Sequence, residues 1–409
     1  MNILYINHYA GSLEMGMEFR PYYLAHEWQK MGHKVRIVAA DYSHLRKQNP
    51  KVKKDFEIQH INGIEYQWVK TGRYNGNGSA RAMTMLEFCG KLSLKAGQIA
   101  KDFQPDAVIS SSTYPLDTYP AQRISAIAKC RYIHEAHDLW PLTLTEIGGM
   151  SARHPFIVLL AAAERAAYSS ADKVVSLFPD AYKHMLKHGM QSMDKYVYIP
   201  NGIVVDDWDH SEPIPEEHRR LLDKLKKEGR FIVMYLGGHA LSNSLDVLID
   251  SAEFADSQQT AFILVGKGVE KERLISKSQK KNLSNVYFLP PVSKLQVPEI
   301  LKEADALYIG AKKSPLYKYG VSLNKVYDYM MSGRPIIYGV EASNNDVKEA
   351  DCGITIKPDD PQEVIKAIRT LNAMSLKDRE ELGQNGKKYV LSKYDYSKNA
   401  KIFIEKAIN

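Results

Sequence analysis

The chain starts with a short apolar run, a glycine-containing loop, a helical stretch and a second apolar run. We predict strands at residues 3–6 and 34–40, joined by a loop that carries Gly16 and by a helix over residues 17–31. A strand–helix–strand unit of this length places its two strands parallel in one sheet. This start constrains the chain to the α/β class.

The same alternation continues through the first half and starts again after residue 230. In the first half we expect further strands at 64–69, 107–111, 131–135, 173–177 and 196–199, with helices at 80–103, 117–129 and 152–170. In the second half we expect strands at 231–236, 261–265, 286–289, 306–309 and 335–338, with helices from about 243, 270, 322 and 361. The pattern predicts two doubly wound, Rossmann-like α/β domains that face each other across a ligand-binding cleft.

The length of 409 residues fits two domains of roughly 200 residues each. We expect a first domain over residues 1–202 and a second over 231–392. Residues 203–230 are charged and contain two prolines, so we expect a linker there. The tail from about residue 393 is expected to pack back on the first domain as a helix.

Three widely spaced cysteines exclude a disulfide framework and a Cys-x-x-Cys metal site, which fits a reducing compartment. The first residues lack a basic leader, and the longest apolar run is too short for a membrane span, so we expect a cytoplasmic protein. Residues 30–103 hold 14 Lys and Arg against 6 Asp and Glu. This excess is either a solvated basic face or a region attracted to an anionic membrane surface or a phosphate-bearing acceptor. No nucleic-acid motif accompanies the charge.

The stretch from Tyr317 to Ile337 is predicted to form a loop, a short helix that opens near Ser322 or Leu323, a turn and a strand. The N-terminus of a helix offers free N–H groups to phosphate oxygens. Asn324 and Asp328 are four residues apart and share one helical face. The stretch therefore predicts a nucleotide site, with phosphate at the helix end and the Asp328 carboxylate on ribose hydroxyls.

Two further glycine loops follow predicted strands of the second half. Gly237 and Gly238 follow the first strand, and Gly266-Lys267-Gly268 follows the second. Neither loop fits a dinucleotide or P-loop pattern. Lys267 is either a solvated side chain of a turn or a contact to an anion.

His134 to Pro141 crowd polar groups at the end of a first-domain strand. We do not expect a metal site here, because no third ligand follows at a usual spacing. His137 and Asp138 are better suited to hydrogen bonding a hydroxylated substrate or to stabilising charge that develops in a reaction. The sequence shows neither a nucleophile elbow nor an obvious pair of glycosidase carboxylates.

Several of these motifs, in this order, make the whole chain similar to family-4 glycosyltransferases of the GT-B architecture. The motifs are the first glycine loop and the helix ending at residues 30–35 (KMGHKV), 137–141 (HDLWP), 199–202 (IPNG), 266–270 (GKGVE), 320–328 (GVSLNKVYD) and 332–335 (SGRP). The HDLWP and S-x-N-K forms resemble a bacterial subgroup that builds surface polysaccharides such as capsule, O-antigen or exopolysaccharide. This subgroup includes aminosugar transferases of the fucosamine type.

The resemblance implies a nucleotide-diphosphate sugar donor, usually linked to UDP, that binds mainly to the second domain. It also implies that the sugar is transferred with retention at the anomeric carbon. The resemblance implies further that this reaction requires neither a metal nor another cofactor. Carried over by position, Asp328 matches the ribose-binding acid, and His137 matches a histidine near the donor sugar. The remaining matched donor-binding positions are Gly16, Val321, Ser322, Leu323 and Asn324.

The chain departs from the family pattern at two places. Gly320 stands where the family has a sugar-contacting Glu, eight residues before Asp328. Gly238-His239 and Ser242–Ser244 replace the Arg and Lys that the family commonly has after the first strand of the second domain. Lys325 or Lys267 is expected to supply the positive charge instead.

The sequence therefore predicts a retaining hexosyl or aminosugar transferase that moves a sugar from a UDP-sugar to a glycan or a polyprenyl-diphosphate-linked acceptor. We expect it in the cytoplasm, with peripheral contact at the inner face of the membrane as a further hypothesis. Two alternatives remain: a nucleotide-sugar epimerase or hydrolase, and a catalytically silent binding subunit.

Overall fold

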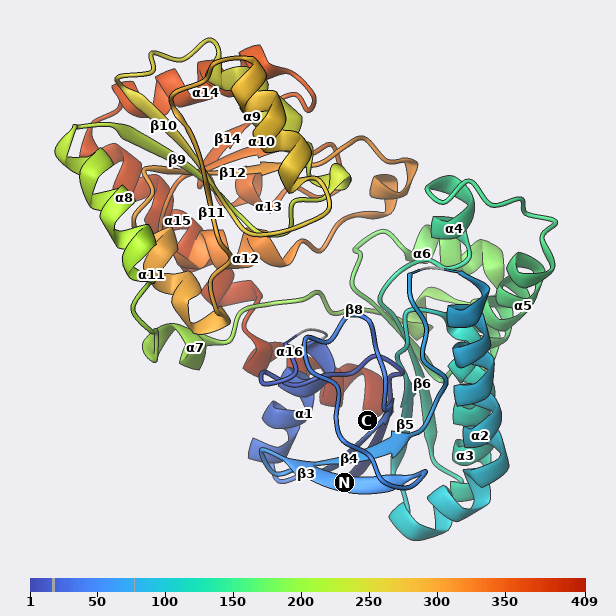
Figure 1. Cartoon of the computed structure of the whole chain (residues 1–409). Helices are drawn as coiled ribbons and strands as arrows, with labels where there is room; N and C mark the ends of the chain where they lie inside the picture. The colour runs from blue at the N-terminus through green and yellow to red at the C-terminus, as the bar shows by residue number, and fades with distance from the viewer. Residues whose placement is uncertain (17–18, 77) are drawn as a thin grey trace. The chain divides into compact units, whose positions relative to one another are not determined.

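The computed structural model describes residues 1–16, 19–76 and 78–409, and its backbone contacts divide the chain into two compact units (Figure 1). The first unit contains Met1–Asn201, the short loop Tyr319–Ser322 and the C-terminal segment Tyr396–Asn409. The second unit contains Gly202–Lys318 and Leu323–Asp395. Each unit is built around one sheet with helices on both faces.

The sheet of the first unit has eight strands in the order β3-β4-β2-β1-β5-β6-β7-β8. The strands are β1 (Asn2–Ile6), β2 (Lys34–Ala40), β3 (Glu57–Ile61), β4 (Ile64–Val69), β5 (Ala107–Ser110), β6 (Arg131–Ala136), β7 (Lys173–Ser176) and β8 (Tyr196–Tyr198). All neighbours pair in parallel except β3, which forms an antiparallel edge hairpin with β4. The sequence did not predict β3, because its residues are only partly buried and carry no apolar run.

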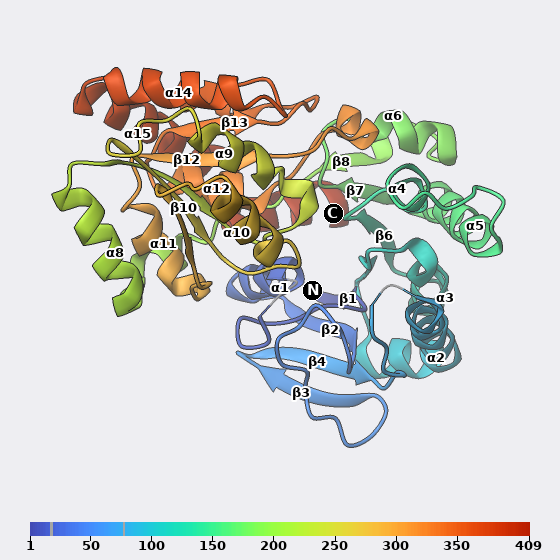
Figure 2. The same ribbon diagram turned by 45° about the horizontal axis from the view of Figure 1, so that its top comes forward.

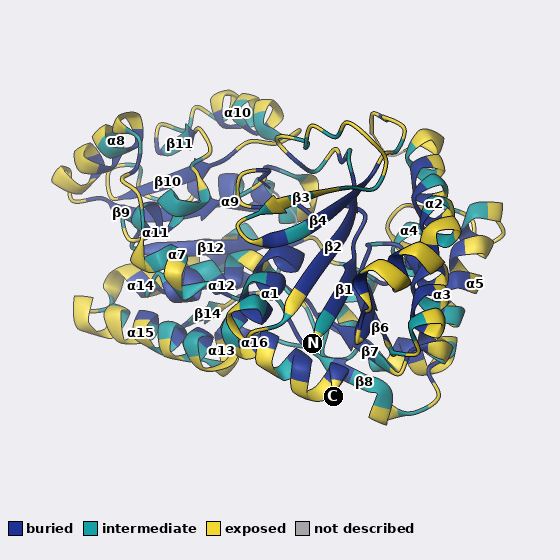
Figure 3. Ribbon diagram, turned by 90° about the horizontal axis from the view of Figure 1, so that it is seen from below, coloured by how far each residue is buried: buried dark blue, intermediate teal, exposed yellow. Residues whose placement is uncertain are grey.

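Helices cover both faces of this sheet. They are α1 (Phe19–Lys30), α2 (Ser79–Phe103), α3 (Thr118–Ala128), α4 (Leu142–Glu146), α5 (Pro155–Ser170), α6 (Tyr182–Met185) and α16 (Tyr396–Phe403). Apolar side chains of α2, α3 and α5 form one core with β1, β2 and β5. On the other face, the Trp28 ring of α1 packs against Tyr5 of β1 and Phe403 of α16, and its Nε1 donates to the Ala400 carbonyl at 3.1 Å. Figure 3 shows β1 and β2 coloured mostly as buried, between helices whose colours mix buried and exposed residues.

The sheet of the second unit has six parallel strands in the order β11-β10-β9-β12-β13-β14. The strands are β9 (Phe231–Leu236), β10 (Thr260–Val265), β11 (Val286–Leu289), β12 (Ala306–Gly310), β13 (Ile336–Gly339) and β14 (Gly353–Thr355). Read from β9 as the first strand, this is the 3-2-1-4-5-6 order of the Rossmann fold. Strand β14 is short and half-exposed, and the sequence did not predict it.

The two faces of the second sheet have separate cores, because successive strand residues point to opposite sides. Phe231, Val233 and Tyr235 face the helices α9 (Leu245–Ala252), α10 (Lys271–Lys280) and α14 (Pro361–Ala373). Ile232 and Met234 face the other set, in the core that α8, α11, α12 and α15 share. The helices of that set are α8 (Glu216–Lys227), α11 (Val297–Leu301), α12 (Asn324–Met331) and α15 (Leu376–Lys393), which are labelled in Figure 2. The short α13 (Asp346–Glu349) precedes β14.

The segment 203–230, expected to be a linker, is instead part of the second unit. It forms α7 (Val205–Asp209) and α8 (Glu216–Lys227), and Leu222 and Leu225 of α8 are fully buried in the core. Pro215 does not break a helix, because it stands at the N-cap of α8, where a missing N–H costs nothing. The charged residues that suggested a linker form the exposed face of an amphipathic helix.

Two other boundaries differ from the sequence prediction. The helix expected over residues 17–31 is described from Phe19, and its first two predicted residues lie outside the described residues. The C-terminal tail is divided into α14, α15 and α16, and a π-helical turn over Ile404–Ile408 follows. In the described part of the chain, no helix combines the length and apolar content that a membrane crossing needs.

Candidate active site

The strand order of the second unit reverses between β9 and β12, and ligands of open α/β sheets bind beyond the carboxyl ends of strands at such a point. The loop after β9 starts with Gly237 and Gly238, and Asn243 follows in a short 3₁₀ turn (Leu241–Asn243). Helix α12 follows the loop after β12 and begins at Asn324. The structure therefore brings the predicted donor-binding residues of the β9 loop and of α12 to one edge of one sheet.

The loops after β9 and β10 pack backbone against backbone. A Cβ on Gly266 would lie 2.0 Å from the Gly237 carbonyl oxygen, and one on Gly268 would lie 2.2 Å from the His239 carbonyl oxygen. Gly237 and Gly266 also have φ values of 150° and 147°, which residues with a Cβ atom rarely adopt. The His239 N–H donates to the Lys267 carbonyl at 2.9 Å. The glycines thus lock two loops together with their backbone exposed at the sheet edge.

Lys325 lies at this switch point. Its Nζ donates to Asn243 Oδ1 at 2.9 Å and lies 5.5 Å from the centre of the Tyr235 ring. Asn243 in turn donates from Nδ2 to the Gly238 carbonyl at 2.8 Å. Burial lowers the pKa of Lys325 to about 8. In the part of the chain that the structure describes, no carboxylate pairs with this ammonium group.

The N-terminus of α12 adds backbone donors beside Lys325. Leu323 occupies the N-cap and provides no side-chain cap, and the first turn carries no acid. An uncapped, acid-free helix start of this kind favours an anion. Val321 and Ser322 lie just before it, in the loop that belongs to the first unit, where Ser322 Oγ accepts from the Asn201 N–H at 3.0 Å.

Asp328 lies one turn further along α12, and Lys294 Nζ donates to both of its oxygens at 2.8 and 3.0 Å. Both side chains are partly exposed. A carboxylate has about four acceptor positions, so this ion pair leaves lone pairs for hydroxyl donors. The sequence did not predict that Lys294 pairs with Asp328, because Lys294 lies in a separate segment of the chain.

His239 is a residue of this edge whose role the sequence analysis did not recognise. It is fully buried, and neither of its ring nitrogens has a hydrogen-bond partner among the described residues. Burial, reinforced by the nearby charge of Lys271, lowers the pKa of His239 to about 4, so the ring is neutral near pH 7. The only sequence signal was its place directly after the glycine pair.

Lys267 and Gly16 contribute in different ways. The Lys267 side chain is exposed, and its carbonyl rather than its ammonium joins the two glycine loops. Gly16 belongs to the first unit, in the loop after β1, with φ of 68° and its N–H donating to the Ser12 carbonyl at 2.9 Å. A Cβ on Gly16 would lie 2.9 Å from the Lys47 side chain.

The first unit has its own strand reversal, between β1 and β5, and a buried carboxylate network lies nearby. Glu135 at the end of β6 is fully buried and accepts from Arg20 Nε and Nη2 at 3.0 and 2.8 Å. Ser111 Oγ donates to it at 2.6 Å, and the Tyr5 hydroxyl also donates to it. His137 Nε2 lies 3.1 Å from the same carboxylate.

This network keeps Glu135 ionised. Burial alone would raise the pKa of Glu135, but the charge of Arg20, supported by His137 and by hydrogen bonds, holds that pKa well below its ordinary value. Arg20 also donates to the Pro200 and Ile199 carbonyls at 2.7 and 2.8 Å. The sequence motifs around His137 and Asn201 are therefore connected through one guanidinium group.

The structure gives different surroundings to His137 and Asp138. The contact with Glu135 and one with Ser111 Oγ at 2.8 Å orient His137 through Nε2, which leaves Nδ1 as the other ring nitrogen. Asp138 accepts from the Leu139 N–H at 2.8 Å and from Thr143 Oγ1 at 2.7 Å. Burial raises the pKa of Asp138, although these hydrogen bonds oppose the shift. Asp138 thus shapes the turn that precedes α4.

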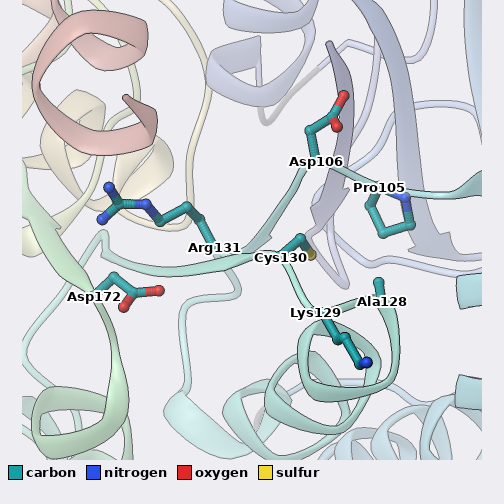
Figure 4. Close-up of a pocket in the computed structure, with 7 residues that line it drawn as sticks. All are labelled: Pro105, Asp106, Ala128, Lys129, Cys130, Arg131 and Asp172. Atoms are coloured by element: carbon teal, nitrogen blue, oxygen red, sulfur yellow. The ribbon is translucent and has the colours of Figure 1, made fainter.

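A pocket of about 440 Å³ lies at the opposite edge of the first sheet, where β5, β6 and β7 begin. Figure 4 shows the residues that line it. Asp106, Cys130, Arg131 and Asp172 line it. The Asp172 carboxylate accepts from the Tyr132 N–H at 2.8 Å, and Arg131 donates to the Asn409 oxygen at 3.0 Å. These side chains are thus engaged in the structure of the unit, away from the edge where parallel sheets bind ligands.

Comparison with known proteins defines the class. The family model described as glycosyl transferase 4-like domain matches residues 15–202, and the model described as glycosyl transferases group 1 matches residues 218–389. Each half of the chain carries a glycosyltransferase domain. Together the two matches show that the chain belongs to the family-4 glycosyltransferases with two Rossmann-like domains.

Solved structures share the fold at low sequence identity. A sucrose-phosphate synthase of Thermosynechococcus elongatus has a TM-score of 0.74 at 16% identity, over 99% of this chain and 97% of that one. HepE of Anabaena, solved with UDP and glucose, has a TM-score of 0.68 at 14% identity, over 99% and 98%. WaaG, a glycosyltransferase involved in lipopolysaccharide biosynthesis, has a TM-score of 0.67 at 16% identity, over 99% of both chains.

A curated relative shares part of the sequence. WcaI of Escherichia coli strain K12, named as a colanic acid biosynthesis glycosyl transferase, is 24% identical over 156 residues. The match spans 38% of this chain and 38% of the length of that relative. The similarity to an aminosugar transferase subgroup of the fucosamine type stays a prediction.

Proposed function

We propose that the chain is a retaining glycosyltransferase that moves a hexosyl or aminosugar group from a UDP-sugar to a glycan or lipid-linked acceptor of a bacterial surface polysaccharide. The second unit binds the nucleotide diphosphate, and the first unit binds the acceptor. The HepE structure, which contains UDP and glucose, and WaaG, which is involved in lipopolysaccharide biosynthesis, support the donor and acceptor classes.

The observation that carries this proposal is the ammonium group of Lys325. Partial removal from water is unfavourable for a cation unless an anion compensates it, and the described residues offer the half-buried Lys325 an amide oxygen and a tyrosine ring. The uncapped start of α12 and the exposed backbone of Gly238 lie at the same sheet edge. A diphosphate satisfies the cation and the free N–H groups together.

In the proposed reaction the acceptor hydroxyl oxygen forms a bond to the anomeric carbon on the face from which the nucleotide leaves. The bond between that carbon and the diphosphate oxygen breaks, and the diphosphate leaves with the electron pair and takes up the hydroxyl proton. Lys325 and the α12 N–H groups stabilise the charge that develops on the leaving group. This chemistry needs no protein nucleophile.

Asp328 and His137 have separate roles in the proposal. Asp328, whose carboxylate accepts from Lys294 Nζ, accepts hydrogen bonds from the ribose hydroxyls. His137, oriented through Nε2 by Glu135, offers Nδ1 to a hydroxyl of the reacting sugar. Asp138 acts as a positioning residue, because its oxygens accept bonds from Leu139, Trp140 and Thr143.

We also propose that the basic region 30–103 attracts an anionic membrane surface that carries the acceptor. Part of its charge is neutralised within the fold, since Arg36 pairs with Glu65 and Lys91 with Asp55. Lys51, Lys53 and Lys54 are exposed and remain available to the surface. Sedimentation with anionic liposomes at low salt measures this attraction, and no binding there would contradict it.

A thermal-shift screen of UDP, GDP, TDP and ADP on the purified chain tests the donor class, because a tight ligand raises the melting temperature. We expect UDP to give the largest shift. The matching nucleotide sugar is then incubated with and without acceptor, and the anomeric configuration of the product is read by NMR. Epimerised or hydrolysed sugar in the absence of acceptor would favour an epimerase or hydrolase, and binding without any turnover would favour a silent subunit.

Variants test the site in the same assay. Asp328→Ala and His137→Ala are each expected to lower turnover by about 10²-fold, the usual cost of removing one stabilising contact. Lys393→Ala, an exposed residue of the second unit that pairs with Glu349, is the control and keeps wild-type turnover. Full activity in both site variants contradicts the proposed site.

A further inference from the structure

Three metal-ligating side chains meet in the first unit, outside the residues used above. Glu164 lies on α5, His184 on α6, and His188 in the turn that continues α6. Their candidate ligand atoms all lie within 4.8 Å of one another. In the described part of the chain, these three residues are the group of His, Cys, Asp or Glu side chains that could hold a metal ion at such a spacing.

The geometry is close to that of a coordinated ion. His184 Nε2 lies 2.7 Å from Glu164 Oε1, and His188 Nδ1 lies 3.6 Å from Glu164 Oε2. When ligand atoms bind an ion at about 2.0–2.2 Å in a tetrahedral site, any two of these ligand atoms lie roughly 3.3–3.6 Å from each other. An ion therefore needs the distance between His184 Nε2 and Glu164 Oε1 to increase by less than about 1 Å.

The donor set selects the kind of ion. His184 and His188 are four residues apart and their rings stack, with ring centres 4.0 Å apart and an angle of 21° between the planes, so one ring has to turn for both nitrogens to point at a single ion. Two imidazoles with one carboxylate are the ligands that Zn²⁺ and its transition-metal neighbours prefer, whereas Mg²⁺ and Ca²⁺ prefer oxygen ligands. We propose that Glu164, His184 and His188 form a binding site for a divalent transition-metal ion, with Zn²⁺ as the favoured occupant.

Burial and access both fit such a site. The side chains of Glu164 and His184 are 2% and 4% exposed, whereas that of His188 is 46% exposed. The two buried ligands give the ion a fixed seat, and the exposed one provides an entry path and a position for a bound water molecule. The Tyr168 ring lies edge-on to His184 and orients it from behind.

The ion would anchor a segment that supports the loop Tyr319–Ser322. The His184 ring packs edge-on against Tyr319, with ring centres 5.7 Å apart. The Asp180 N–H donates to the Tyr319 carbonyl at 3.0 Å. Cross-linking α5 to the His184 segment therefore rigidifies the residues that hold this loop, which is a structural role independent of the sugar-transfer proposal.

Metal titration of the full chain tests the site. The protein is stripped with EDTA, dialysed, and titrated with Zn²⁺ in competition with a chromophoric chelator. We expect one equivalent to bind with a Kd at or below the micromolar range, to raise the melting temperature, and to resist displacement by excess Mg²⁺. Co²⁺ in place of Zn²⁺ should give the visible absorption of a histidine-ligated ion.

His188→Gln is the informative variant, because the residue is half-exposed and its loss leaves the core intact. It should weaken Zn²⁺ binding by at least about tenfold, the lower range seen when a metal site loses a supporting group. His210→Gln, an exposed histidine of the second unit, is the matched control and should bind Zn²⁺ like the wild type. Absence of Zn²⁺ binding in the wild type, or equal binding by His188→Gln, overturns the proposal whatever the sugar-transfer assay gives.

Discussion

The two units carry charges of opposite sign at the edges of their sheets, a fully buried carboxylate in the first unit and a half-buried ammonium group in the second. In the first unit the buried carboxylate of Glu135 receives hydrogen bonds from Arg20, Tyr5 and Ser111, so its charge is compensated within the fold. In the second unit the ammonium of Lys325 meets only an amide oxygen and an aromatic ring among its described partners. The first charge is balanced by the protein, and we propose that a ligand balances the second.

This difference separates positioning from binding. A fully satisfied buried network fixes side-chain geometry, and here it fixes His137 and the backbone of residues 199–201. Loss of water contact lowers the pKa of the half-buried Lys325, and a bound anion would favour its charged form. We therefore expect variants of the Arg20–Glu135 pair to act mainly on stability, variants of His137 on sugar transfer, and variants of the second edge mainly on ligand affinity.

The largest expected effect is a loss of folding stability in the first unit. Arg20→Met leaves Glu135 buried without its cation, and loss of one partner of a buried pair costs about 3–5 kcal/mol. Urea denaturation followed by circular dichroism measures the free energy of unfolding. Lys294→Met breaks a partly exposed pair and should cost at most about 1 kcal/mol. Equal losses in the two variants would contradict the contrast between the units.

The next effect concerns the glycine loops of the second unit. Gly266→Ala places a Cβ against the Gly237 carbonyl at a φ of 147° and should cost about 1–3 kcal/mol of stability. Gly238→Ala is the matched control, because nothing lies within 4 Å of its Cβ position. Thermal unfolding of the two variants compares them, and a Gly266→Ala melting temperature equal to that of Gly238→Ala would show that the loops are not locked.

The pH dependence of nucleotide binding follows from Lys325. Its pKa of about 8 means that the free protein carries this charge below pH 8 and loses it above. A bound diphosphate favours the charged form, so UDP affinity should fall as pH rises through 8, by up to about tenfold per pH unit. Calorimetric titrations from about pH 6.5 to 9.5 measure the fall. Lys325→Arg should remove it, and a pH-independent affinity in the wild type would contradict the assignment.

The smallest expected effect is at Asp328. Asp328→Asn removes a charged acceptor for the ribose hydroxyls and should weaken UDP binding by about tenfold, or about 1.4 kcal/mol. Calorimetric titration of the same protein preparations measures this loss of UDP affinity. Asp360→Asn, at the N-cap of α14, should leave UDP affinity unchanged. If the two variants bind UDP equally well, Asp328 does not contact the nucleotide.

The sequence predicted the alternation of elements well because apolar strand runs are bounded by charged residues, glycine or proline. The strands at 34–40, 64–69, 231–236 and 286–289 are confirmed at both ends. The linker prediction was wrong because charge and proline were weighed more than the apolar side of α8. Periodicity over 216–227, with Leu222 and Leu225 on one side, would have indicated a helix packed on a core.

The candidate sites were predictable only in part, for a physical reason. Residues at strand ends and helix starts, such as His137 and Lys325, are marked by local pattern. Their partners are not, because Arg20 meets Glu135 across 115 positions and Lys325 meets Asn243 across 82. Long-range pairing of this kind depends on strand order, which the sequence pattern alone does not determine.

The most direct test of the account is calorimetric titration of UDP into Lys325→Met and His137→Ala beside the wild type. Loss of a charged hydrogen bond to the diphosphate should weaken UDP binding to Lys325→Met by roughly 10- to 100-fold, which corresponds to about 1.5–3 kcal/mol. His137→Ala should bind UDP like the wild type and fail only in sugar transfer. Wild-type UDP affinity in Lys325→Met, together with lost affinity in His137→Ala, would contradict the division between a positioning unit and a nucleotide-binding unit.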